Sequence, residues 1–306
     1  MLSRPLEYDS LKTVLLHMDA NMRIQISRRM PFLRNVEKIV PIKIAHLSIY
    51  DFTTTINDTS YRLGIFRHFN SGKIPTVIEE ENNLGGVKSD IDQYGFSIPS
   101  GRKDVLPGDV PLYLEGEDAE EALENTEEME MQHRQSVEVR EGALKRIGEL
   151  KAKGITIDEY FDHLEPIELT AETLKEHRIR QNIQLFPGFL EYLLESDRTK
   201  LIPFECRRNG TRPPFNCYIQ LTIQKGNLKK IQRFEYSMKL FEAAKKLNEI
   251  LFGGRNFPIQ VTTFDAIPSA KMYRLPIKFR LQVQILHAKS KTLRHENFSS
   301  IKAGQF

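Results

Sequence analysis

The residues best suited to chemistry are two nearby carboxylates, Asp90 and Asp92, and two thiols, Cys206 and Cys217. A calcium loop would also need a glycine at its sixth position and a bidentate glutamate at its twelfth, and the sequence has neither. The aspartates are therefore predicted to cap turns through hydrogen bonds to nearby backbone N–H groups. The cysteines lack partners at zinc spacing, and Cys217 falls on the inward phase of a strand, which favours a buried thiol. We expect no metal and no cofactor.

Catalytic signatures are missing from the chain. It contains no Gly-x-Ser-x-Gly elbow, no phosphate loop, no His-Glu-x-x-His and no kinase signature, and Gly85-Gly86 is too short to be a nucleotide loop. The eight histidines are scattered. We therefore expect a protein without enzymatic activity, although a site assembled from distant residues stays open.

The composition is that of a globular protein, with 40% hydrophobic and 28% charged residues in 306. The length allows two domains. No apolar run reaches the roughly 18 residues of a membrane span. With two cysteines and no apolar signal sequence, we expect a cytoplasmic or nuclear protein.

Charge is distributed unevenly along the chain. Residues 115–176 hold 19 acidic and 7 basic residues, a net charge of −12, whereas residues 200–306 hold 20 basic and 6 acidic residues, a net charge of +14. The two blocks could attract each other, or the basic end could face a polyanion.

The elements that would present a functional surface begin with a hook of three short helices at residues 5–40. Asp9 and Ser10 are candidate caps of the first helix, Asn21 is a candidate cap of the second, and Pro31 suits the first turn of the third. Their apolar residues recur at helical spacing. Helices this short cannot bury all of that surface among themselves, so part of it must pack on the rest of the chain or on a partner.

The hook resembles an F-box over residues 5–19 and 22–29, and the remainder resembles the nematode F-box C family, in which a domain of unknown function follows the F-box. The second resemblance rests on Asn57-Asp58-Thr59-Ser60-Tyr61-Arg62-Leu63-Gly64, Gly85-Gly86-Val87, Asp90-Ile91-Asp92, Tyr94-Gly95-Phe96 and Phe252-Gly253-Gly254. It implies a substrate-recruiting subunit of a cullin-based (SCF-type) ubiquitin ligase that binds a Skp1-like adaptor and an unknown protein target. The residues that would contact the adaptor are Leu6, Leu11, Val14, Leu15, Met18, Ile24 and Ile26.

The rest of the chain divides into three predicted parts. Residues 41–114 predict a β-rich module. The apolar alternation of its first strand shifts by one residue, and Asn57-Asp58 forms the turn to the second strand. Residues 115–153 predict a charged helical spacer that starts acidic and ends basic. Residues 154–306 predict an α+β module. Alternation over 217–223 predicts a strand, and Lys225-Gly226-Asn227 turns it into a hairpin. Also predicted are a helix from Ser237 that Gly253-Gly254 closes and a long strand over 275–285 in an antiparallel sheet. The helix would have one apolar face, made of Leu240, Phe241, Ala244, Leu247 and Leu251.

The predicted fold class is therefore α+β: an F-box-like hook of three helices, then antiparallel-rich mixed sheets with packed helices and a charged helical spacer. Two alternatives to adaptor binding remain. The hook could be only a structural element of a protein-binding protein. The basic module could bind nucleic acid through Lys229, Lys230, Lys278 and Arg280, which is the weaker alternative because few aromatic residues accompany them.

Overall fold

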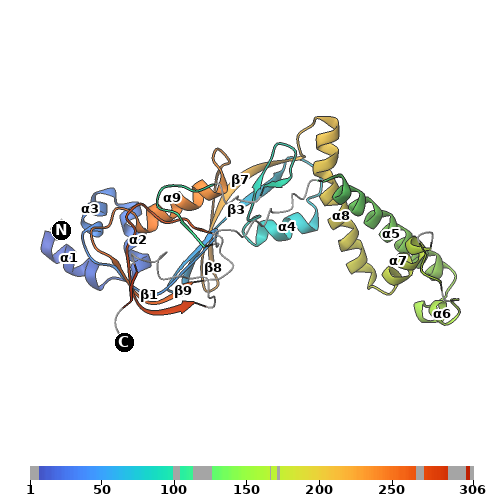
Figure 1. The fold of residues 1–306 in the computed structure, drawn as a ribbon, viewed down its shortest axis with the longest axis horizontal. Helices are drawn as coiled ribbons and strands as arrows, with labels where there is room; N and C mark the ends of the chain where they lie inside the picture. The colour runs from blue at the N-terminus through green and yellow to red at the C-terminus, as the bar shows by residue number, and fades with distance from the viewer. Residues whose placement is uncertain are drawn as a thin grey trace, which may run out of the picture.

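The N-terminal hook folds as short helices at one end of an elongated molecule (Figure 1). The computed structural model describes residues 7–98, 104–112, 126–165, 167–170, 173–266 and 272–288, and the backbone of 301–303. The helices of the hook are α1 (Tyr8–His17), α2 (Ala20–Arg29), the 3₁₀ turn η1 (Pro31–Leu33) and α3 (Arg34–Lys38). Pro31 lies in the first turn of η1, as predicted.

A large mixed sheet forms the middle of the molecule, and its strands run in the order β12-β11-β9-β1-β2-β3-β7-β8. Their bounds are β1 (Lys43–Tyr50), β2 (Thr53–Ile56), β3 (Thr59–Phe69), β7 (Phe215–Lys225), β8 (Leu228–Glu235), β9 (Ile259–Ala266), β11 (Leu281–Ala288) and β12 (Ile301–Ala303). From β1 to β8 neighbouring strands are antiparallel, whereas β1, β9, β11 and β12 are parallel. The predicted α+β class is confirmed, with helices and a mixed sheet in one chain.

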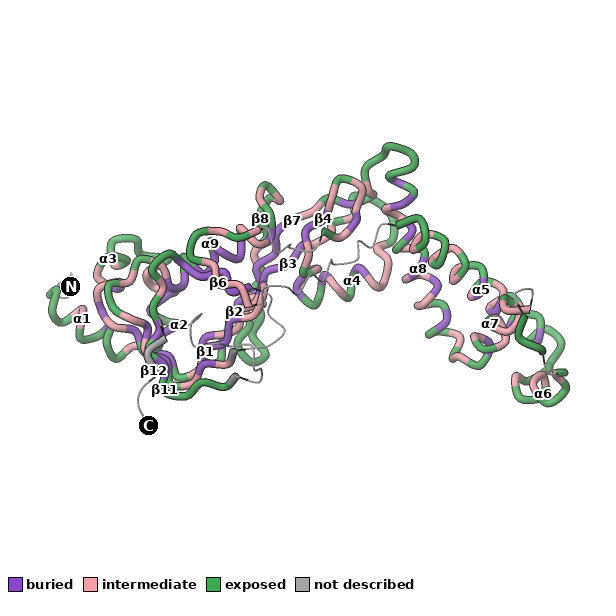
Figure 2. The backbone as a smooth tube through the Cα atoms, in the orientation of Figure 1, coloured by how far each residue is buried: buried purple, intermediate pink, exposed green. Residues whose placement is uncertain are grey.

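The sheet joins strands from the two ends of the sequence. Ile44 of β1 pairs with Val261 of β9, so the stretches expected at 41–114 and 154–306 contribute to the same sheet. Buried segments of β1, β3 and β7 mark the shared core (Figure 2).

The predicted long strand over 275–285 is shorter in the structure. β11 begins only at Leu281, because the chain turns at Ile277 and Lys278, and Lys278 has a φ of +61° that no strand residue adopts. The strand is also parallel to β9, where we expected an antiparallel arrangement.

Helix α9 (Leu240–Phe252) supplies much of the core. Its inward stripe agrees with the prediction at Leu240, Ala244, Leu247 and Leu251, which are buried, while Phe241 is half-buried. Its N-terminus differs from the prediction, because the carboxylate of Glu242 accepts a hydrogen bond from the N–H of Lys239 at 2.9 Å, and Ser237 is not the cap.

Helix α4 (Thr76–Asn83) and the glycines after it lie against β3. Gly64 in β3 leaves room for this contact, because a Cβ at this residue would lie 2.3 Å from the carbonyl oxygen of Gly85. Two-stranded pairs complete the β structure, namely β4 (Asp90–Ile91) with β5 (Ser97–Ile98) and β6 (Val110–Pro111) with β10 (Met272–Tyr273).

Four helices form an arm at the end opposite the hook (Figure 1). They are α5 (Glu127–Ala152), α6 (Ile157–Asp162), α7 (Leu174–Ile183) and α8 (Pro187–Asn209). As predicted, α5 starts with glutamates and ends near Lys151. It does not stand free as the expected solvated spacer, because Ala143 and Ile147 pack with Ile183 and Leu190 of the neighbouring helices. The acidic run before it, residues 113–125, lies outside the described residues.

Across the described part of the chain, none of the helices combines the length and apolar character that crossing a membrane requires.

Candidate docking surface of the N-terminal helices

Helix α2 is fixed to the sheet by apolar and polar contacts. Ala20 and Ile24 are each 1% exposed and belong to the main core. Asn21, 3% exposed, donates from Nδ2 to the carbonyl oxygen of Ile56 at 2.9 Å and accepts from the hydroxyl of Tyr61 at 3.0 Å. Burial raises the pKa of Tyr61 to about 12, which keeps the phenol protonated as a donor. The inward face of α2 therefore packs on this protein's own sheet and is not open to a partner.

The caps of the hook differ from those predicted. Asp19 is the N-cap of α2 and accepts from the N–H groups of Asn21 and Met22 at 2.9 and 3.2 Å. Asn21 lies in the first turn and reaches the sheet. Helix α1 begins one residue before Asp9, and its N-cap residue, Glu7, makes no side-chain capping bond.

Arg23 fixes the corner between α2 and α3. Its guanidinium is 1% exposed, donates to the carbonyl oxygens of Pro41 and Val40 at 2.7 and 2.8 Å, and lies 3.1 Å from a carboxylate oxygen of Glu37. Arg255, which follows α9, meets the same oxygen at 2.8 Å. Burial lowers the pKa of Arg23 and the neighbouring Glu37 opposes that shift. This ion-paired cluster holds the hook against the C-terminal part of the chain.

The seven residues that the F-box resemblance assigns to adaptor contact separate into inward and outward groups. Leu15 and Ile24 are each 1% exposed, so they cannot touch a partner in this conformation. Val14 is 42% exposed. The half-buried members are Leu11, Met18 and Ile26, and Leu6 lies outside the described residues.

Exposed apolar residues that the sequence reasoning did not select lie on the same helices. Met22 is 51% exposed and precedes Ile26 by one helical turn, on the side of α2 away from Ile24. Tyr8, Leu16 and Phe32 are also exposed. The exposure of Met22 could have been predicted from the sequence. Residues four apart share one face of a helix, and residues two apart lie on opposite faces, so Met22 lies on the face of Ile26 and opposite Ile24. The exposed and half-buried residues that the resemblance assigns to adaptor contact, together with Met22, are called the hook surface. They are Leu11, Val14, Met18, Met22 and Ile26.

The four basic residues considered for nucleic acid lie in two separate places. Lys229 and Lys230 belong to β8, at one edge of the sheet, whereas Lys278 and Arg280 lie just before β11, near the other edge. Lys278 and Arg280 line a cavity of about 220 Å³ beside Arg255, and Arg280 donates to the carbonyl oxygen of Asn256 at 2.6 Å. The structure does not bring the four together as one basic surface.

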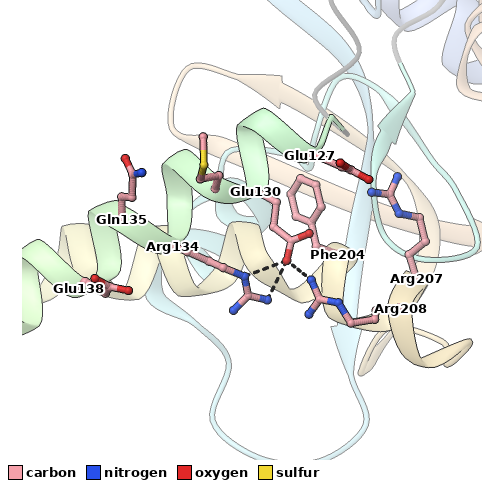
Figure 3. Close-up of a pocket in the computed structure, with 9 residues that line it drawn as sticks. Glu127, Glu130, Arg134, Gln135, Glu138, Phe204, Arg207 and Arg208 are labelled. Atoms are coloured by element: carbon pink, nitrogen blue, oxygen red, sulfur yellow. Dashed lines mark hydrogen bonds and ion pairs between the residues drawn. The ribbon is translucent and has the colours of Figure 1, made fainter.

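A larger groove, about 770 Å³, lies on the arm between α5 and α8 (Figure 3). Its central carboxylate, Glu130, is ion-paired with Arg134 at 2.7 Å and with Arg208. Burial would raise the pKa of Glu130, but the hydrogen bonds from the two arginines outweigh burial and hold that pKa below its usual value. The charges of Glu130, Arg134 and Arg208 therefore satisfy one another.

Asp92 caps a turn, as predicted, whereas Asp90 lies in β4 and bonds to distant residues, so the predicted local capping is wrong for Asp90. Oδ1 of Asp92 accepts from the N–H groups of Tyr94, Gly95 and Phe96 at 2.8–2.9 Å. Asp90, 3% exposed, accepts from the hydroxyl of Tyr236 at 2.6 Å and from the N–H of Leu240 at 2.8 Å. Both carboxylates are thus used by the fold.

The two cysteines are free thiols. Cys206 is buried and Cys217 is half-buried, and burial raises the pKa of Cys217 to about 11. Within the described residues, no three His, Cys, Asp or Glu side chains converge as a metal site would need.

In a comparison with protein families, the model of a domain of unknown function, DUF3557, matches residues 239–303. The matched stretch runs from the start of α9 to β12 and lies outside the hook. No curated protein and no solved structure matches the chain.

Proposed function

We propose that this protein is a non-catalytic recruiting protein of the nematode F-box C kind, which docks a Skp1-like adaptor of a cullin-based ubiquitin ligase on its hook surface. The observation that carries the proposal is the outward apolar side of α1 and α2, above all Val14 and Met22, which are 42% and 51% exposed. The resemblance of residues 5–29 to an F-box supports the same reading.

The base under this surface is held by several buried contacts. Asn21, Arg23 and Ile24 bind the inward side of α2 to the sheet and to α3, so the outward side is presented at little cost in conformational entropy. Exposed apolar anchors on a preorganised helix are typical of binding hot spots.

The hook and the arm lie at opposite ends of the molecule (Figure 1). An adaptor on the hook would leave the arm and the edge strand β8 of the large sheet open to a target protein. This arrangement suits a subunit that must hold two partners at once.

Co-purification with recombinant adaptor tests the proposal. Leu15→Asp is a poor probe, because Leu15 is 1% exposed and a buried charge would disrupt the hook itself. Val14→Asp and Met22→Asp place the charge on the surface instead, and Thr13→Asp, exposed on α1, is the matched control.

We expect the wild type and Thr13→Asp to retain the adaptor, and Val14→Asp and Met22→Asp to lose it while their thermal unfolding is unchanged. A wild type that fails to bind, or surface variants that bind as well as the wild type, would refute adaptor docking.

A second candidate function is a protein-binding protein whose hook is only structural. It is favoured by the inward burial of Leu15 and Ile24 and by the ion-paired cluster around Arg23. It predicts that the folded wild type does not retain the adaptor. The same co-purification therefore separates the two candidates.

A further inference from the structure

Strand β8 is an exposed edge of the large sheet. It is last in the strand order and, among the described residues, pairs only with β7. Every residue of β8 except Gln232 is exposed, including the large apolar residues Leu228, Ile231 and Phe234 at 76%, 43% and 49%. Soluble proteins protect such edges or use them for pairing, since unpaired N–H and C=O groups are a template for another strand.

The turn before β8 identifies the backbone groups that face outward. The hairpin turns through two residues, with Gly226 at a φ of +54°, and Lys225 pairs with Leu228. Hydrogen-bonded and non-hydrogen-bonded pairs alternate along an antiparallel ladder, counted from this turn-closing pair. The residues that direct their N–H and C=O groups away from β7 are therefore Lys229, Ile231, Arg233 and Glu235.

The two faces of β8 have different neighbours. On one face, Phe234 lies beside Ile219 and Gln232 lies beside Leu221. Ile219 and Leu221 are core residues of β7, so the side chains of an added strand would lie next to apolar residues on this face. On the other face, Lys229 donates to the carbonyl oxygen of Asn83 at 2.5 Å.

Arg233 also lies on that second face. It donates to Oε1 of Gln220 at 3.0 Å, and its guanidinium lies 3.6 Å from the centre of the Phe66 ring. A strand that suits both faces would alternate apolar and polar residues.

The charge of β8 indicates which kind of strand can pair with its edge. Lys229, Lys230 and Arg233 outnumber Glu235, the one acidic residue of β8. A second copy of β8 would pair two strands that each carry three basic residues and one acidic residue, and an excess of like charge on paired strands is destabilising. An acidic segment would bring opposite charges to the same places.

We propose that β8 binds an extended acidic segment of a partner protein by strand addition, with acidic side chains alternating with apolar ones. Main-chain hydrogen bonds to β8 supply affinity, and the basic side chains supply the preference for acid. The site is separate from the hook surface and goes beyond adaptor docking, because β8 lies in the middle of the molecule and the hook at one end (Figure 1).

Fluorescence anisotropy with the full-length protein tests the proposal. The probe is a labelled peptide of alternating valine and glutamate, about eight residues long to match a strand. One control peptide carries lysine in place of glutamate. The other has the acidic sequence with every second backbone nitrogen methylated along one edge, which keeps the charge and removes the donors that strand addition uses.

We expect the acidic peptide to bind at low ionic strength and to weaken as salt is added, and both control peptides to bind at least about tenfold more weakly. Ile231→Pro removes one outward N–H while sparing the ladder to β7, and should weaken binding about tenfold as well. Ile231→Thr keeps that N–H and should bind within about threefold of the wild type.

Four results would overturn the proposal. Equal binding of the methylated peptide would exclude strand addition, and equal binding of the lysine peptide would exclude selection by charge. Failure of the acidic peptide to bind the folded wild type would refute the site outright. These readouts use no adaptor, so their failure is distinguishable from failure of the proposed function. A dimer in sedimentation that Ile231→Pro dissolves would instead assign the edge to a second copy.

Discussion

The hydroxyl of Tyr61, in the third strand, donates to the side-chain oxygen of Asn21, in the second helix, at 3.0 Å. Both residues are buried, at 1% and 3% exposure, so water cannot replace either partner. The hook therefore depends on the sheet for a polar contact as well as for apolar packing.

Removing this hydroxyl should destabilise the protein. Tyr61→Phe leaves the oxygen of Asn21 buried without that donor, and we expect a loss of about 1–3 kcal/mol in the free energy of unfolding. Urea unfolding measures it, and Tyr8→Phe, on an exposed ring, is the control that should change by less than about 0.5 kcal/mol. Equal stability of the two variants would mean that the Asn21–Tyr61 bond contributes nothing net.

The cluster around Arg23 predicts a larger effect. Arg23→Met removes one partner of Glu37 and leaves the carbonyl oxygens of Val40 and Pro41 without their donor, so we expect a loss of about 3 kcal/mol or more. Arg29→Met, exposed on the same helix, should change stability by less than about 0.5 kcal/mol. The measurement is again urea unfolding. A loss no larger than the control's would show that Arg255 alone suffices for Glu37.

Two glycine-to-alanine substitutions should have opposite signs. Gly64→Ala would place a methyl carbon 2.3 Å from the carbonyl oxygen of Gly85, so the segment after α4 must move and stability should fall by about 1–3 kcal/mol. At Gly148 in α5 an added Cβ would meet nothing within 4 Å apart from its chain neighbours and the backbone of its own helix, and Gly148→Ala should stabilise by about 0.5–1 kcal/mol. Thermal unfolding checks both, and a neutral Gly64→Ala would show that the contact between Gly64 and Gly85 can widen to admit a methyl group.

The ion pairs of Glu130 predict a pH dependence. Because its pKa in the folded protein lies below the unfolded value, the carboxylate contributes stability at pH values above the unfolded pKa, and that contribution is lost as the pH falls through the folded pKa. Glu130→Gln should therefore be less stable than the wild type at pH 7, and the two should converge only once the pH is below the lowered folded pKa.

Urea unfolding of both proteins across this pH range measures the effect, with Glu128→Gln, exposed on the same helix, as the matched control. A difference between Glu130→Gln and the wild type that persists unchanged at low pH would show that the loss is one of packing and not of charge.

The sequence was informative wherever a local pattern decides the outcome. Alternation predicted β7 and its turn at Gly226, helical spacing predicted the inward stripe of α9, and turn chemistry predicted the capping by Asp92. These features depend on near neighbours in the chain, which one sequence displays.

Pairing between distant segments was not predictable in the same way. The alternating pattern of β11 says which side chains share a face, but not that its neighbour is β9 or that the two are parallel. Val14 and Leu15 are both apolar residues of α1, and only packing against other elements makes one 42% exposed and the other 1%. The apolar residues of the hook could thus be recognised in the sequence, but the buried Leu15 could not be told from the exposed Val14.

The pairing of Ile44 with Val261 has a consequence for synthesis. When β1 leaves the ribosome, the strand that must lie beside it is more than 200 residues from being made. At about 5–20 residues per second this interval is roughly 10–40 s, in which one side of β1 has no native partner. During that interval the nascent chain exposes apolar strand residues, and a chaperone that shields residues 43–69 would raise the yield of folded protein.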